Sequence, residues 1–216
     1  MGRALVAMGI AALAGGCSGI QGGSEGEETG HCVYRDVTLT DPDAVPEGFT
    51  KSPRELLAAA QGRFSGKVRR HAVSLDLATT LDDLSAHYDE SGFSNCKPGL
   101  SSSASATLVL DDLPAQPAAV AGLELRAGSA LAMATFEASA DAPLVAVTPT
   151  FAGTVVDTPF LDLWLTFDAA GASSHWQWRA FVACDAGQQC SGGPSPSGAA
   201  TNGAEVNWGD ARLSRE

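Results

Sequence analysis

Basic residues are scarce in this 216-residue chain: 13 lysines and arginines stand against 25 aspartates and glutamates, giving a formal net charge of -12 and a pI near 4.6. Nucleic-acid binding needs lysine and arginine in excess over a surface patch, because these residues contact the phosphates. We therefore expect no nucleic-acid partner. Charged residues make up only 18% and apolar residues 44%, so the chain can bury a core and one folded domain is expected.

The spacing motifs of metal and redox sites are also missing. No Cys-x-x-Cys occurs, and the four histidines are scattered over the chain, at positions 31, 71, 87 and 175. Zinc and redox sites place their ligands at short, regular spacings. We therefore expect no bound metal and no cofactor.

No complete motif for a catalytic nucleophile is present. Gly62–Gly66 lacks the Gly-x-Ser-x-Gly order of a nucleophile elbow, and it precedes an expected strand where the elbow precedes a helix. We therefore predict no catalytic residue. An envelope hydrolase acting on glycan or ester substrates is kept as an alternative, and it would need Ser65, His71 and an acidic partner in one site.

The N-terminal apolar run is too short to span a membrane. It extends over residues 4–14, about half of the ~20 residues that a spanning helix needs. Arg3 precedes it and Gly15-Gly16-Cys17 follows it, which is the pattern of a secretory signal. These residues resemble a bacterial lipoprotein signal, although Ala14 stands where such signals usually have leucine.

The resemblance implies that Cys17 is lipidated once residues 1–16 are removed, and that acyl chains tether the protein to the membrane of a bacterial cell envelope. Two or more such chains anchor a protein firmly. The same resemblance implies, from Ser18 after the cysteine, sorting to the outer membrane, with the protein facing the periplasm or the cell surface. A plain signal peptide cut near Ala14, which would leave Cys17 as a free thiol, is the alternative.

Cysteine number agrees with a lipidated Cys17. Five is an odd number for an exported chain, and assigning one to the lipid leaves an even set that can pair in an oxidising compartment. This set comprises Cys32, Cys96, Cys184 and Cys190. The short spacing of Cys184 and Cys190 suits a small loop and leaves Cys32 with Cys96, although four cysteines allow three pairings.

Composition divides the mature chain into three parts. Residues 17–30 form an expected flexible linker, residues 31–190 a disulfide-bonded domain, and residues 191–216 a flexible tail rich in glycine, serine and proline. Trp208 in this tail is a candidate for docking onto the domain.

Alternation of apolar and polar residues predicts an all-β fold, an antiparallel sandwich or barrel-like domain with one or two short helices. The expected strands lie near residues 33–39, 71–77, 107–110, 120–125, 130–138, 144–147, 153–156, 161–167 and 176–183. Ser52, Pro53 and Glu55 form the capping box of a first helix. A second helix is expected from Thr80 to about Tyr88.

Half of the basic residues of the mature chain fall between Lys51 and Arg70. From this segment we select a candidate anion-binding set comprising Arg63, Lys67, Arg69 and Arg70. Such a set could form a positive face for an anionic glycan or lipid headgroup. The alternative is that the segment lies across acidic strands and neutralises them. If residues 68–77 form one strand, Arg69 and Arg70 point to opposite faces.

The tryptophans of the last two expected strands differ in their predicted exposure. Trp176 and Trp178 share a face with small apolar residues, which predicts burial, whereas Trp164 lies opposite an apolar face and is the candidate for an exposed, sugar-stacking aromatic. We interpret the protein as a lipid-anchored, non-catalytic binding or envelope-assembly module whose partner is an envelope protein or glycan. A carrier of a small apolar ligand is a further alternative.

Overall fold

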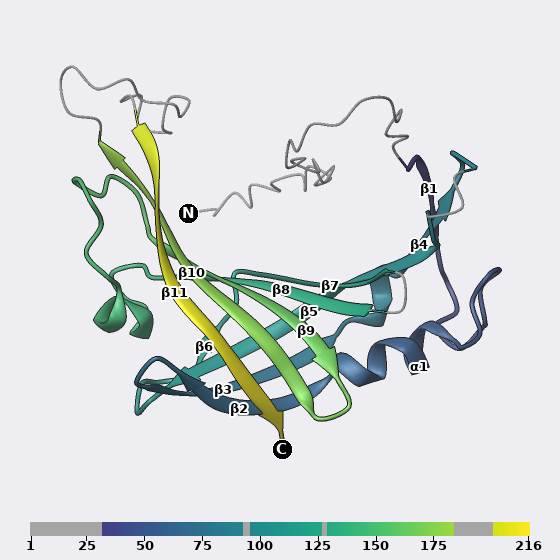
Figure 1. Ribbon diagram of the computed structural model, residues 1–216, viewed down its shortest axis with the longest axis horizontal. Helices are drawn as coiled ribbons and strands as arrows, with labels where there is room; N and C mark the ends of the chain where they lie inside the picture. The colour runs from purple at the N-terminus through teal and green to yellow at the C-terminus, as the bar shows by residue number, and fades with distance from the viewer. Residues whose placement is uncertain (1–31, 93–95, 127–128, 184–200) are drawn as a thin grey trace, which may run out of the picture. The chain divides into compact units, whose positions relative to one another are not determined.

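The computed structural model describes residues 32–92, 96–126, 129–183 and 201–216, which belong to one unit, His31–Glu216 (Figure 1). Within these residues, eleven strands form one antiparallel sheet, confirming the predicted all-β class. The strands are β1 (Tyr34–Thr38), β2 (Gly62–Val68), β3 (His71–Thr79), β4 (Ser85–Asp89), β5 (Gly99–Leu110), β6 (Gln116–Pro117), β7 (Val120–Arg126), β8 (Ser129–Glu137), β9 (Phe160–Asp168), β10 (Gly171–Ala183) and β11 (Thr201–Arg215). The helical segments are α1 (Pro53–Leu57), η1 (Ala58–Ala60), η2 (Leu81–Asp83) and η3 (Pro143–Val147).

Eight of the strands close into a barrel-like ring. Neighbouring strands follow the order β5, β3, β2, β11, β10, β9, β8 and β7, and β7 pairs back onto the first half of β5. β5 has 12 residues, of which residues 99–103 pair with β7 and residues 104–110 pair with β3. β4 and β1 extend the sheet beside the start of β5.

Aromatic side chains fill the interior of the ring. Trp176 and Trp178 on β10 are fully buried, as their shared face predicts, and Trp208 of β11 is only 4% exposed. The Trp208 ring lies edge-on to both, at 6.2 Å from Trp176 and 5.9 Å from Trp178. The three rings therefore pack against one another in the core.

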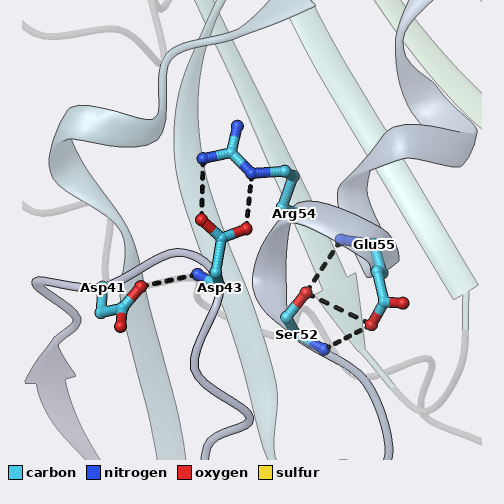
Figure 2. Close-up of polar contacts among 5 residues, drawn as sticks. All are labelled: Asp41, Asp43, Ser52, Arg54 and Glu55. Atoms are coloured by element: carbon cyan, nitrogen blue, oxygen red, sulfur yellow. Dashed lines mark hydrogen bonds and ion pairs between the residues drawn. The ribbon is translucent and has the colours of Figure 1, made fainter.

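The predicted first helix is confirmed. The Ser52 side chain accepts from the Glu55 backbone N–H at 3.4 Å, and a Glu55 carboxylate oxygen accepts from the Ser52 backbone N–H at 3.0 Å (Figure 2). These two bonds satisfy N–H groups that have no partner inside the helix. Arg54 forms a bidentate pair with Asp43, at 2.7 and 3.3 Å, which ties the helix to the preceding loop.

Helix α1 and η1 cover the core. Leu57 and Ala60 are completely buried in the main apolar cluster, and the two segments pack against β7, β8 and β9. Among the described residues, no helix combines the length and apolar character that a bilayer span requires.

The expected second helix is wrong. The chain forms the one-turn η2 and then strand β4. Leu84 and Ala86 are both fully buried, which is the two-residue period of a strand. The Asp83 side chain accepts from the Ser103 backbone N–H at 3.1 Å and from the Ser103 hydroxyl, and these two bonds connect η2 to β5.

Two short strand predictions also fail. Residues 144–147 lie in η3, which begins at Pro143, and this proline fixes a helical φ at the first position. Residues 153–156 contribute only an isolated bridge between Val155 and Val182. Apolar runs of four residues fit a strand or a helical turn equally well, because a run this short does not show whether the apolar residues follow the period of a strand or that of a helix.

The C-terminal residues are the largest departure from expectation. Residues 201–215 form β11, which lies between β10 and β2, where a flexible tail was predicted (Figure 1, yellow). The alternation in β11 is interrupted at Trp208, where the register with β10 shifts by one residue. Gly209 follows with a φ of +115°. Because of this bulge, the inward-facing residues of β11 do not follow one regular alternation along the sequence, so alternation alone does not predict the strand.

Cys32 and Cys96 form a disulfide with a Cα–Cα distance of 5.7 Å, as predicted. It ties the residues before β1 to those before β5, across 64 positions of sequence. Cys17, Cys184 and Cys190 lie outside the described residues, as do the signal and linker segments.

Candidate functional site

The clearest candidate site lies where β2 and β11 separate. These two strands pair over only three residues of each, Phe64 to Gly66 with Leu213 to Arg215. Beyond Gly66, β2 continues to Val68 and turns through Arg69 and Arg70 into β3. A depression of about 600 Å³ lies at this position. We call it the turn pocket, and it is lined by Arg69, Arg70, His71, residues 146–150 and Trp208.

Arg69 has a structural role in the turn pocket. Its Nε donates to the Trp208 carbonyl at 2.8 Å and its Nη2 donates to the Asn207 carbonyl at 2.9 Å. Both carbonyls lie on β11 beyond the three residues that pair with β2. The Arg69 side chain therefore continues the contact between the β2–β3 turn and β11. Its φ of +51° is unusual for a residue with a side chain, and these two bonds hold it there.

Arg70 is the cation that the turn pocket leaves available. Its side chain is exposed and makes no hydrogen bond or close ion pair with another described residue. The positive charge of Arg70 contributes to lowering the pKa of Asp111. An exposed guanidinium of this kind can pair with two oxygens of a carboxylate or phosphate.

His71 is held in place by Asp111. Its Nδ1 lies 2.7 Å from one Asp111 carboxylate oxygen, and the Ala72 backbone N–H donates to the other oxygen at 2.8 Å. These two hydrogen bonds, with the His71 bond as the larger cause, lower the pKa of Asp111. The His71 ring lies 5.1 Å from the Trp208 ring. The imidazole is thus fixed on two sides, and its Nε2 has no partner among the described residues.

The structure brings together only half of the predicted anion-binding set. Arg69 and Arg70 are the two residues of the β2–β3 turn, so the expectation that they occupy one strand and point to opposite faces is wrong. Arg63 and Lys67 lie earlier on the exposed face of β2 and do not line the turn pocket. Arg63 instead has acidic neighbours, Asp76 and Glu216, each at 3.8 Å.

The residues of the hydrolase alternative are not assembled. Ser65 of β2 is directly opposite Ser74 of β3 and Ser214 of β11. His71 lies three positions from Ser74 on β3, and an odd separation places the two side chains on opposite faces of the sheet. His71 has its acidic partner, but Ser65 lies on the other face.

A second depression, of about 500 Å³, lies on the outer face of β9, β10 and β11. We call it the outer groove. Its lining includes the side chains of Trp164, Thr166, Ser173, His175, Asp210 and Arg212. Trp164 is partly exposed there, whereas Trp176 and Trp178 are buried. The sequence therefore distinguished the three tryptophans, but it did not show which side chains surround Trp164.

Histidine–aspartate pairs are the feature that sequence reasoning missed. In the described part of the chain, Nδ1 of His71, His87 and His175 lies within 2.7 Å of a carboxylate oxygen of Asp111, Asp36 and Asp210, respectively. Each partner is at least 35 positions away in sequence, so no local spacing indicates it. The described residues contain no group of three or more such side chains placed to hold a metal ion.

No protein-family model, no curated protein and no solved structure matches the chain. The chemistry of the two depressions is therefore interpreted from their own residues.

Proposed function

We propose that this protein is a lipid-anchored, non-catalytic module of the bacterial cell envelope that binds the acidic groups of an envelope glycan in its turn pocket. The observation that carries the proposal is the convergence of Arg70, a cation with no close partner among the described residues, with the fixed imidazole of His71. Hydroxyl groups are close by, because Thr148 and Thr150 line the same pocket.

These groups suit an anionic sugar. The Arg70 guanidinium pairs with the carboxylate or phosphate, and the His71 Nε2 and a threonine hydroxyl contact neighbouring sugar hydroxyls. A charge-assisted hydrogen bond contributes ~1.5–3 kcal/mol, so the site binds weakly on its own. Repeated acidic groups along a glycan raise the overall affinity when several tethered copies bind together.

A glycan is favoured over a lipid headgroup because the lipid anchor expected on Cys17 already attaches the protein to the membrane. The acyl chains expected on Cys17 anchor it without any protein surface contact. The turn pocket is then free for a ligand other than the membrane.

The binding proposal is tested with full-length protein purified in detergent and titrated with oligogalacturonic acid, a carboxylate-bearing sugar polymer. Arg70→Gln should weaken binding by about tenfold or more, which corresponds to ~1.4 kcal/mol. Lys67→Gln is the matched control, because it removes the same charge three positions away, outside the pocket. Equal losses for the two variants, or no saturable binding by the wild type, would refute the proposal.

The anchoring proposal is tested by the intact mass of the protein isolated from bacterial membranes. We expect cleavage after residue 16 and the added mass of acyl chains on Cys17. Cys17→Ser should move the protein to the soluble fraction of the envelope. An unmodified Cys17 in membrane-bound wild-type protein would contradict the proposal.

A further inference from the structure

The outer groove is built from a row of side chains in exact cross-strand register. His175 of β10 is directly opposite Trp164 of β9 on one side and Asp210 of β11 on the other. Met133 of β8 is opposite Trp164 and continues the row. Directly opposed side chains on one face of a sheet lie close enough to contact each other. The row therefore presents one aromatic platform beside two polar groups.

The polar end of this row is fixed. His175 Nδ1 lies 2.7 Å from Asp210 Oδ1, and the His175 ring lies 5.6 Å from the Trp164 ring at an angle of 37°. An Nδ1–H that donates to Asp210 leaves Nε2 as an acceptor in the neutral imidazole. The His175 side chain is 40% exposed and that of Asp210 is 82% exposed. Both are accessible to a ligand that rests on Trp164.

The neighbouring row supplies further hydrogen-bonding groups. Ser173 is opposite Thr166 and Arg212, and Arg212 Nη1 donates to the Ser173 hydroxyl at 3.2 Å. Arg212 also pairs with Asp168 at the end of β9. This ion pair holds the Arg212 side chain over the groove and cancels its charge.

The charges identify the kind of ligand. Arg212 is neutralised by Asp168, while Asp210 adds a negative charge beside His175, so the groove does not attract an anion. It offers instead an aromatic surface, hydroxyl groups, a carboxylate and an imidazole. Sugars present apolar C–H faces and hydroxyl edges, which are complementary to this combination. A volume of about 500 Å³ is within the range of small-ligand sites.

We infer that the outer groove is a second binding site, specific for an uncharged oligosaccharide, with one pyranose ring stacked on Trp164 and its hydroxyls bonded to His175, Asp210 and Ser173. This inference goes beyond the proposed acidic-glycan site and stands independently of it. Trp208 points into the ring of strands and Asp210 lies on the outer face, so the two sites use opposite faces of β11.

The test titrates the full-length protein and its variants with two uncharged sugars, chitopentaose and cellopentaose, by isothermal titration calorimetry, and follows tryptophan fluorescence of the wild type as a second readout. The other described tryptophans, Trp176, Trp178 and Trp208, are buried, so binding should change the emission of Trp164. Trp164→Ala should weaken binding by about tenfold or more. Trp164→Phe keeps an aromatic ring and should retain part of the affinity. This second variant separates the loss of ring stacking from misfolding of the alanine variant.

Phe181→Ala is the matched control. Phe181 is an exposed aromatic of β10 that lies six positions from His175, about 20 Å along the strand, and its loss should leave sugar affinity unchanged. Arg70→Gln should also leave it unchanged, while Trp164→Ala should leave oligogalacturonate binding at the turn pocket intact. The inference is overturned if neither sugar binds saturably, if Phe181→Ala weakens binding as much as Trp164→Ala, or if Trp164→Ala leaves sugar binding unchanged.

Discussion

At the scale of single residues, hydrogen-bonding partners distinguish side chains that look equivalent in sequence. Trp176 and Trp178 are both fully buried on β10. Trp176 Nε1 donates to the Ser174 hydroxyl at 2.8 Å, whereas Trp178 Nε1 has no partner among the described residues. A buried donor without a partner loses its hydration and gains nothing in return.

This difference leads to a prediction about two matched substitutions. Trp176→Phe and Trp178→Phe remove the same volume, but only the first removes a hydrogen bond. We expect Trp176→Phe to reduce the free energy of unfolding by ~1 kcal/mol more than Trp178→Phe does. Urea denaturation followed by circular dichroism measures both values. Equal losses, or a larger loss for Trp178→Phe, would show that the Nε1 environments are not those of the structure.

Arg69 and Arg70 allow a second comparison between neighbours. Arg69 donates to two backbone carbonyls of β11, and Arg70 donates to none among the described residues. Arg69→Ala should therefore reduce the free energy of unfolding by ~1–3 kcal/mol, while Arg70→Ala should stay within ~0.5 kcal/mol of the wild type. Thermal and urea unfolding provide the measurement. A marked loss of stability in Arg70→Ala would mean that Arg70 supports the fold, which would weaken its assignment to ligand binding.

At the scale of secondary-structure elements, turns and bulges decide which residues meet. Strand β9 ends at Asp168, where the β9–β10 turn begins, and the Asp168 carboxylate accepts from the Ala170 backbone N–H at 2.8 Å and from the Gly171 backbone N–H at 3.2 Å. Arg212 of β11 reaches the same carboxylate. The hydrogen bond from Arg212 is the largest cause that lowers the pKa of Asp168, which falls to about 2.

The lowered pKa predicts a pH dependence of stability. Because the folded-state pKa of Asp168 lies below the ordinary aspartate value of ~3.9, its ionised form stabilises the fold fully above that value. This contribution is lost as the pH falls through the folded-state pKa of about 2. We therefore expect Asp168→Asn to be less stable than the wild type at pH 7, with a difference that shrinks between about pH 4 and pH 2. Urea denaturation across this range tests it, and a pH-independent difference would contradict it.

Alanine substitutions at Gly171 and Gly209 test the β9–β10 turn and the bulge in β11 separately. Both have positive φ, +151° and +115°, which alanine adopts at a cost of ~1 kcal/mol or more. A Cβ on Gly171 would lie 2.0 Å from the Leu213 carbonyl oxygen, whereas one on Gly209 meets nothing within 4 Å. Gly171→Ala should therefore cost more than ~3 kcal/mol, and Gly209→Ala only ~1 kcal/mol. Similar losses in urea denaturation would show that crowding at Gly171 is relieved by backbone movement.

At the scale of the whole molecule, closure of the ring depends on contacts between distant parts of the sequence. β5 pairs with β7 to close it, and β11 joins β10 to β2. The disulfide adds a covalent link between Cys32 and Cys96, near the starts of β1 and β5. A cross-link of this length restricts the unfolded chain and stabilises the fold by up to ~4 kcal/mol.

Removal of this disulfide should weaken the fold without changing its architecture, because the link lies outside the ring of eight strands. We expect the double variant Cys32→Ser/Cys96→Ser to lose ~2–4 kcal/mol of unfolding free energy and to keep its far-ultraviolet circular dichroism spectrum. Loss of that spectrum would mean that the β1–β4 extension is needed for the barrel to form. Serine at these two positions leaves the remaining cysteines unchanged.

Features that depend on residues close together in the chain could be predicted from the sequence. The alternation on β9 and β10 predicted the all-β class and the different exposures of Trp164, Trp176 and Trp178. Ser52, Pro53 and Glu55 predicted the start of α1, because a capping box is complete within four residues. Counting and spacing favoured the pairing of Cys32 with Cys96, but four cysteines left three pairings open, and the structure shows this one.

The contacts between residues far apart in the chain depend on how the strands pair in the folded protein. The bulge at Trp208 shifts the inward face of β11 by one residue. Strict alternation therefore does not predict this strand, and its residues were expected to form part of a flexible tail. The partner of His71, Asp111, directly follows β5, and the partner of His175, Asp210, lies on β11. Arg69 and Arg70 separate from Arg63 and Lys67 only because the chain turns after Val68. Strand pairing across the ring fixes all of these, and no local pattern encodes the register between segments so far apart.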